Sequence, residues 1–251
     1  MNKIVLYAET VDVPSIDAAL PGYEIVAAAG MNELARAIVE QSPVVAVVIE
    51  KRELDEQFRR LLFSLKLSFP MLPGCLISSP LTERLPDGYH LLAAGANEEE
   101  TAAKIGEFVA ASGFADRRDR PRFDWPLQGL LSFDREHWQK HKLWALSADG
   151  AFLEAAGSPP AAGSKGFLRI TFRNSRLVTH CEVLDPRRAS SRLPAGFAVR
   201  FTLLSQDSKR LLDRIVQDTL VQTLLKPETE PDIPSLGEEE LSISGFEPLD
   251  G

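Results

Sequence analysis

Four arginines lie close together in one short segment of the chain. Residues 117–122 read Arg-Arg-Asp-Arg-Pro-Arg and have no apolar period, which indicates a loop. Each guanidinium offers a planar fork of N–H donors, and such forks bind anions through paired hydrogen bonds. The sequence therefore predicts an arginine-rich linker loop at residues 113–122 that binds an anion. The alternative is a surface linker in which the arginines bind nothing.

A second polar group lies at a turn farther along the chain. The segment Ala145-Leu-Ser147-Ala-Asp-Gly150 joins two apolar stretches, and the Asp-Gly pair at its end is typical of turns. The Ser147 hydroxyl can donate a hydrogen bond to a ligand. Gly150 permits a tight turn and a close approach of that ligand. The alternative is an ordinary hairpin turn.

Charge is distributed unevenly along the 251 residues. Residues 1–116 carry 9 basic and 17 acidic side chains, residues 117–225 carry 18 and 11, and residues 226–251 carry 1 and 8. The basic middle segment, which contains both polar groups, is where an anion would bind. The acidic last segment is rich in proline and has no apolar period, so we expect residues 226–251 to be a disordered tail.

The sequence offers little for catalysis or metal binding. His137 and His141 have the spacing of a helical zinc pair, but no third ligand accompanies them. No phosphate-binding glycine loop or nucleophile elbow is present. We therefore expect no catalytic residue, no metal site and no cofactor.

Residues 1–112 alternate short apolar runs with amphipathic segments. Residues 44–49 form a β-branched run without polar alternation, which is typical of a strand covered on both faces. Strands that alternate with helices at this spacing predict a doubly wound parallel sheet. We expect strands at residues 3–9, 23–29, 44–49, 73–78 and 90–94, and helices at residues 32–41, 54–68 and 98–112.

The pattern changes in residues 123–225. Short β-rich stretches separated by turn residues predict a small antiparallel barrel or sandwich. Over residues 207–225, leucine and valine recur every four positions from residue 212 to residue 224 and predict one amphipathic helix that closes the domain. The β-rich stretches are residues 125–133, 143–153, 167–172, 177–184 and 197–204.

Residues 1–112 resemble the receiver domain of two-component response regulators. In that family an acidic pair follows the first strand, a phosphoacceptor aspartate ends the third, a serine or threonine ends the fourth, and a lysine ends the fifth. Here Glu9 stands alone, Glu50 occupies the acceptor position, Ser78 or Ser79 fits the hydroxyl position, and the lysine is missing. The resemblance implies a pseudo-receiver without phosphorylation chemistry. Glu50 either mimics a charged, switched-on state or is a solvated residue at a strand end.

Residues 115–225 resemble the PilZ family, bacterial receptors for the second messenger cyclic di-GMP. That family has an Arg-x-x-x-Arg pair in its leading loop, an Asp/Asn-x-Ser-x-x-Gly turn, and a Gly-x-x-Val-x-Phe strand before a terminal helix. Residues 118–122 supply the arginine pair, residues 145–150 supply the turn with its first residue changed to alanine, and residues 196–201 supply the strand. The resemblance implies a PilZ-like antiparallel β-barrel over residues 123–225.

The resemblance also implies a ligand and the residues that bind it. Cyclic di-GMP presents two phosphates and two guanines, and arginine forks match both phosphate oxygens and the O6 and N7 edge of guanine. The implied binding residues are Arg117, Arg118, Arg122, Ser147 and Gly150.

Position 145 departs from the family pattern. The usual Asp or Asn can accept a hydrogen bond from a guanine amine, and Ala145 cannot. Losing one such bond costs about 1 to 3 kcal/mol of binding free energy. The alternative function is therefore a degenerate PilZ scaffold that binds no nucleotide and acts only by protein–protein interaction.

The resemblance implies that the protein is a non-enzymatic bacterial signalling adaptor, which binds cyclic di-GMP through its PilZ-like domain. Its output would pass through an unidentified protein partner in motility, pilus or polysaccharide machinery, and we do not expect nucleic acid as a partner. The longest apolar runs are shorter than the roughly 18 residues that a bilayer span requires, so we expect no membrane span. The chain also starts without the pattern of a secretory signal, and we expect a cytoplasmic protein.

Overall fold

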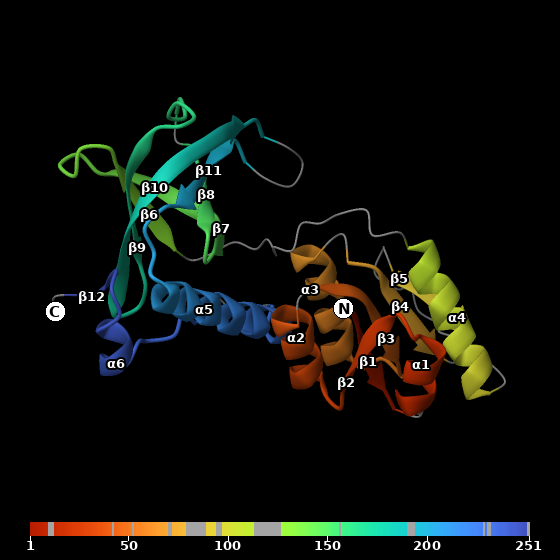
Figure 1. Cartoon of the computed structure of the whole chain (residues 1–251). Helices are drawn as coiled ribbons and strands as arrows, with labels where there is room; N and C mark the ends of the chain where they lie inside the picture. Colours follow the sequence, from red (N-terminus) through yellow and green to blue (C-terminus); the bar gives the residue numbers. More distant parts are fainter. Residues whose placement is uncertain are drawn as a thin grey trace. The chain divides into compact units, whose positions relative to one another are not determined.

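The chain divides into two compact units. The computed structural model describes residues 1–9, 13–41, 43–51, 53–69, 72–78, 89–93, 97–112, 127–155, 157–189, 194–227, 229 and 232–249. Unit 1 comprises Met1–Pro121 and Leu220–Thr229, and unit 2 comprises Arg122–Thr219 and Glu230–Gly251 (Figure 1). No described helix has the length and the apolar character needed to cross a membrane.

Unit 1 contains a five-stranded sheet. All its strands are parallel and lie in the order β2-β1-β3-β4-β5, which confirms the doubly wound parallel sheet. Helix α1 was not predicted, because its seven residues are too few to show an apolar period. The elements are β1 (Asn2–Ala8), α1 (Val13–Ala19), β2 (Tyr23–Ala28), α2 (Met31–Glu40), β3 (Val44–Glu50), α3 (Glu56–Ser68), β4 (Gly74–Ser78), β5 (Tyr89–Ala93) and α4 (Glu98–Ala111).

The sheet of unit 1 is buried on both faces, as its β-branched third strand predicts. Val47 and Ile49 of β3 point into a cluster with residues of α2 and α3. Ala46 and Val48, which alternate with them along the strand, point into a second cluster with residues of α1 and α4. Each cluster is apolar, so helices on both faces remove the strand from water.

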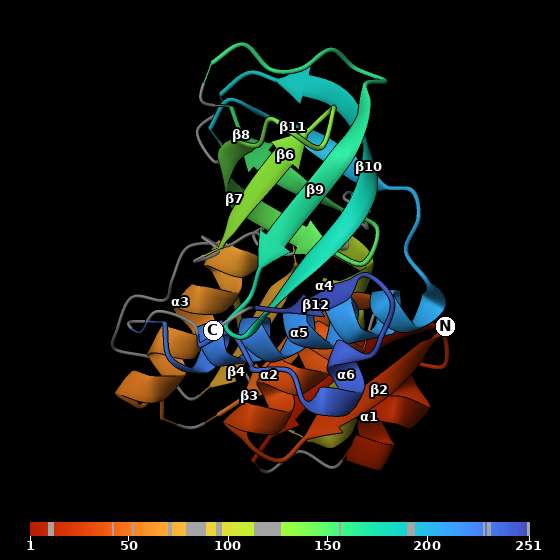
Figure 2. The ribbon, with the colours of Figure 1, turned by 90° about the vertical axis from the view of Figure 1, so that its left-hand side faces the viewer.

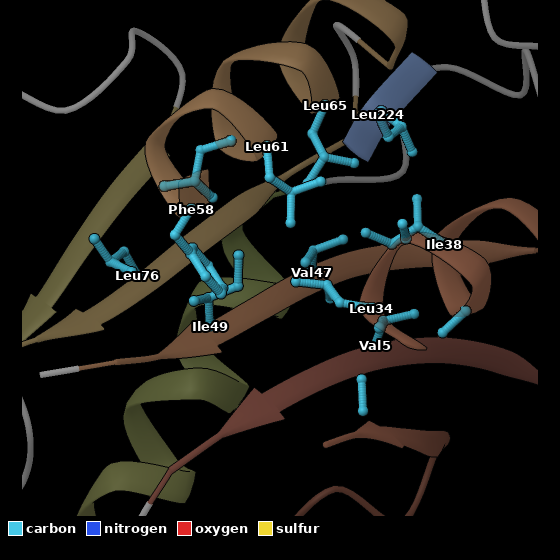
Figure 3. Packing of buried hydrophobic residues seen from close by; sticks show 14 of the residues in the cluster. Val5, Leu34, Ile38, Val47, Ile49, Phe58, Leu61, Leu65, Leu76 and Leu224 are labelled. Atoms are coloured by element: carbon cyan, nitrogen blue, oxygen red, sulfur yellow. The ribbon is translucent and has the colours of Figure 1, made fainter. Parts of the chain in front are cut away.

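The end of helix α5 (Gln206–Leu225) is also part of unit 1. Val221 and Leu224 are buried in the cluster that contains residues of α2 and α3. Figure 3 shows Leu224 near Leu65, with Leu61 and Ile38 in the same group. The division between the units therefore falls inside α5, whereas the sequence predicts that all of this helix belongs to the second domain.

Unit 2 is built on a closed antiparallel barrel of six strands, as expected. Its strands follow the order β11-β8-β7-β6-β9-β10, and pairing between β10 and β11 closes the ring. Figure 2 shows β6, β9 and β10 side by side in the barrel wall. The stretch expected at residues 143–153 is two strands, because the chain turns at residues 148–149. The strands are β6 (Gln128–Ser132), β7 (Gln139–Ser147), β8 (Gly150–Glu154), β9 (Lys165–Thr171), β10 (Ser175–Arg187) and β11 (Gly196–Phe201).

The acidic C-terminal segment differs from the disordered tail expected at residues 226–251. It contains α6 (Glu238–Leu241) and β12 (Phe246–Pro248), and β12 pairs with β10. Ile233, Leu236 and Phe246 are buried. The composition of the segment predicted disorder because composition does not show where side chains lie. In the structure, the three apolar side chains are buried and the acidic residues contact arginines.

Candidate ligand site on the barrel

Ser147 and Gly150 face each other across the hairpin turn between β7 and β8. The Ser147 hydroxyl donates to the carbonyl oxygen of Gly150 at 3.1 Å and accepts from the Asp149 amide at 3.4 Å. The hydroxyl therefore organises the turn in this structure. A ligand that accepts a hydrogen bond from Ser147 would replace the bond to Gly150.

Positions 145 and 147 share the outer face of β7. They are two residues apart in a strand and partly exposed, while Leu146 between them is buried. Trp144, the residue before position 145, lies at a register irregularity of β7. Its indole Nε1 donates to Glu154 Oε2 at 2.9 Å, and Lys142 Nζ lies 4.6 Å from its ring centroid. An aromatic ring and a cation thus adjoin position 145.

Gly150 also has a structural role that the sequence did not predict. Its φ lies outside the left-handed region, so the turn itself does not demand glycine. A Cβ atom at this position would instead overlap the carbonyl oxygen of Val199 on the neighbouring strand β11. A Cβ at Gly196 would likewise overlap the carbonyl oxygen of Leu153. Both glycines allow β8 and β11 to approach closely.

Two residues of helix α5 contact the turn between β7 and β8, and the sequence did not predict these contacts. Lys209 Nζ lies 3.1 Å from Asp149 Oδ1, and the Ala148 amide donates to Asp213 Oδ1 at 3.3 Å. Lys209 thus adds a cation beside the turn that carries Ser147. No sequence signal identifies this contact, because Lys209 and Asp213 have the ordinary positions of exposed helix residues.

The other predicted site residues lie outside the described part of the chain. Arg117, Arg118 and Arg122 all belong to residues 113–126, so their role stays a prediction. The structure separates the two histidines considered as a zinc pair: His141 is buried and bonds the Glu154 carbonyl, whereas the His137 ring is exposed beside Asp134. Among the described residues, no group of three or more His, Cys, Asp or Glu could hold a metal ion.

Comparison with protein families identifies this part of the chain. Residues 116–218 match the family model described as the PilZ domain. Residues 116–218 are a PilZ domain. The match includes the arginine pair, the Ser147 turn and the strand that begins at Gly196, which are the three elements of the predicted resemblance.

Solved structures similar to the chain include three PilZ proteins. Inhibitor of motility (MotI/DgrA) from Bacillus subtilis is 16% identical over 39% of this chain and 48% of that chain, with a TM-score of 0.34. The PilZ domain of YcgR from Escherichia coli, solved with c-di-GMP, is 14% identical over 45% of this chain and 97% of that chain, with a TM-score of 0.36. PlzA from Borreliella burgdorferi, solved in complex with c-di-GMP, is 14% identical over 47% of this chain and 48% of that chain, with a TM-score of 0.26.

The similarity to MotI and to PlzA thus spans about half the length of each of those chains. A comparison with curated proteins finds no match.

Outside the PilZ domain, unit 1 has a polar group where β1 and β3 end. Glu50 is only 7% exposed, and its Oε2 accepts from the Glu9 amide at 2.8 Å. Glu50 is therefore not the solvated residue that one of our two interpretations described. Ser79 and the side chain of Ser78 lie outside the described part of the chain.

Lys51, to which the sequence assigned no role, neutralises part of this group. Lys51 Nζ lies 2.8 Å from Glu9 Oε1, and this hydrogen bond raises the pKa of the Lys51 amine. A receiver-type magnesium site needs free carboxylates, and Glu9 is already paired with an internal ammonium. The longer side chain of Glu50 would also displace a nucleophilic oxygen by about 1 Å from the position of an aspartate oxygen, enough to be costly for catalysis. These residues do not fit that site, and the receiver-like assignment of unit 1 stays a prediction.

We expect the protein to take no phosphoryl group from acetyl phosphate in the presence of Mg²⁺. Glu50 replaces the acceptor aspartate, and Glu9 is bound to Lys51. Intact-mass spectrometry should show an unchanged mass, with an active response regulator as the positive control. A hydroxylamine-sensitive phosphoryl adduct that maps to Glu50 would contradict this expectation.

Proposed function

We propose that the PilZ domain binds cyclic di-GMP and that the chain is a non-enzymatic signalling adaptor, which passes on the ligand's presence through protein contacts. The observation that carries this proposal is the PilZ match over residues 116–218, which includes the arginine loop and the Ser147 turn. The basic balance of residues 117–225 supports it, because the ligand carries two phosphates.

In the proposed complex, Arg118 and Arg122 bind phosphate oxygens and guanine edges, and Arg117 adds positive charge. Ser147 donates to the ligand from the outer face of β7. Trp144 offers an aromatic face and Lys142 a cation beside position 145. Gly150 contributes indirectly, because it keeps β8 close to β11 and thereby holds the turn in place.

Ala145 favours a second candidate function, a scaffold that has lost the nucleotide and works only by protein interaction. Its methyl group accepts no hydrogen bond from a guanine amine. Position 145 lies on the same face as Ser147, so a carboxylate placed there would project beside the hydroxyl. The two functions therefore make different predictions for a substitution at this position.

We expect isothermal titration of the full chain with cyclic di-GMP to show saturable binding. Arg118→Ala should weaken binding by about 2 kcal/mol or more, roughly 30-fold, because a charged bidentate contact is lost. Ala145→Asp should tighten binding by about 1 kcal/mol or more, roughly fivefold, because the guanine amine gains an acceptor.

Two controls test the specificity of this binding. Arg60→Ala removes the same charge from an exposed side chain of α3, outside the PilZ domain, and should leave the affinity unchanged. Cyclic di-AMP lacks the O6 acceptor of guanine and should bind more weakly. If the wild type shows no heat and Ala145→Asp creates no site, the scaffold function replaces the receptor function.

A further inference from the structure

The C-terminal segment, residues 232–249, occupies an edge of the barrel as an added strand. Strand β10 pairs with β11 along Cys181–Arg187 and with β12 along Ser175–Leu177. Two backbone bonds extend the second pairing: the Val178 amide donates to Gly245 at 2.8 Å, and the Leu249 amide donates to Asn174 at 3.1 Å. The segment thus satisfies backbone groups that a β10 edge without it would expose.

Opposite charges align the segment with this edge. Asp232 pairs with Arg173 at 3.1 Å, Glu247 pairs with Arg176 at 2.7 Å, and Glu240 pairs with Arg214 of α5. The segment is acidic and the barrel surface below it is basic, so the fit selects for negative charge. Figure 2 shows α6 and β12 next to α5, where the Arg214 contact is made.

Two further contacts select for an extended backbone and an aromatic side chain. The Asn174 side chain donates to the Leu236 carbonyl at 2.8 Å and accepts from the Leu236 amide at 2.9 Å. Phe246 is 5% exposed, and its ring centroid lies 6.0 Å from that of Phe172. Asn174 thus binds main chain whatever the side chain is, and the Phe246 position accepts an aromatic anchor.

The attachment of the segment is weak for its length. The Arg173 and Asp232 side chains are 62% and 73% exposed, and such exposed ion pairs contribute little to stability. β12 has only three residues, and the apolar attachment of the segment depends on three buried side chains, Ile233, Leu236 and Phe246. Ordering this acidic segment on the edge costs conformational entropy, which favours the released state. The ring of the barrel closes through the pairing of β10 with β11, which does not involve the segment.

We infer that this edge is a docking surface for a partner protein, and that residues 232–249 occupy it as a built-in competitor. The docking surface consists of the β10 edge at residues 174–178 with Arg173, Arg176 and Arg214. Its partner is an acidic, extended segment with an aromatic residue, which adds to β10 as a strand. The inference concerns a protein contact and does not depend on whether nucleotide binds.

The test uses the full chain with a weakened segment. Phe246→Ala combined with Glu247→Arg removes the aromatic anchor and turns one ion pair into a repulsion, which opens the surface. A fluorescein-labelled peptide of residues 232–249 is the probe, and anisotropy measures its binding. The opened variant should bind the peptide at least tenfold more tightly than the wild type, and added salt should weaken that binding.

A charge swap provides the matched control. A chain with Arg176→Glu and Phe246→Ala also loses the aromatic anchor and turns the ion pair with Glu247 into a repulsion, so its surface is open as in the first variant. The resulting chain should reject the native peptide and bind a peptide carrying Glu247→Arg.

Cys181 in β10 is buried, so its protection from alkylation shows that the barrel of each variant is folded. The inference is overturned if the opened variant is folded and binds the peptide no more tightly than the wild type, or if reversing Arg176 has no effect. Concentration-dependent dimers of the wild type in sedimentation would assign the surface to a second copy and overturn the assignment to another protein.

Discussion

Gly150→Ala is expected to destabilise unit 2 by about 3 kcal/mol or more, the upper end of the usual cost of overpacking. The added methyl group would overlap the carbonyl oxygen of Val199, and the other nearest atoms also belong to the backbone of β11. A side chain could rotate away from such a clash, but a paired strand cannot. Relief requires β8 to move away from β11, which lengthens the ladder bonds between residues 150–154 and 196–200.

Tryptophan fluorescence during urea unfolding measures this effect, because all three tryptophans of the chain belong to unit 2. Gly157→Ala is the matched control: a Cβ there meets no atom within 4 Å, and the change should stay within about 0.5 kcal/mol. An unchanged midpoint for Gly150→Ala would show that β8 and β11 separate at little cost. Because this substitution acts on folding, weaker nucleotide binding in the variant would be no evidence of a contact at Gly150.

Leu224→Ala is expected to destabilise unit 1 by about 2 to 5 kcal/mol, the usual cost of deleting a buried leucine side chain. Leu224 is 0% exposed and belongs to the cluster that α2 and α3 form against the sheet. Its truncation leaves a cavity in that cluster, even though Leu224 is more than a hundred positions after Pro121, where the first segment of unit 1 ends.

Cys75 of β4 reports this change separately from the barrel. Burial raises the pKa of its thiol to about 12, so at pH 8 the native thiol is protonated and reacts with iodoacetamide only after unit 1 opens. The labelling rate of Cys75 should rise in Leu224→Ala. Leu67→Ala, at a 62% exposed position of α3, should leave the rate nearly unchanged. Equal rates in Leu224→Ala and the wild type would mean that unit 1 does not need the end of α5.

Several features of this protein could be predicted from local sequence because their physical cause is local. The run at residues 44–49 predicted a strand buried on both faces, and β3 is one. The four-residue spacing of leucine and valine at residues 212–224 predicted one buried helix face, which α5 has. The short β-rich stretches predicted a small antiparallel barrel or sandwich, and the resemblance carried by residues 118–122, 145–150 and 196–201 indicated the PilZ family. Strand alternation, helix period and turn residues depend on neighbours a few positions away.

Other features depended on which distant segments come together, and only the tertiary structure decided them. Gly150 packs against a carbonyl of β11, and the partner of Glu9 is Lys51 from the end of another strand. The acidic segment at residues 232–249 is ordered because its few apolar residues and its carboxylates meet matching groups on β10 and α5. One continuous helix period gave no sign that the last turns of α5 belong to unit 1. Periodicity shows that a face is buried, but the identity of what buries it is set by packing between segments far apart in the chain.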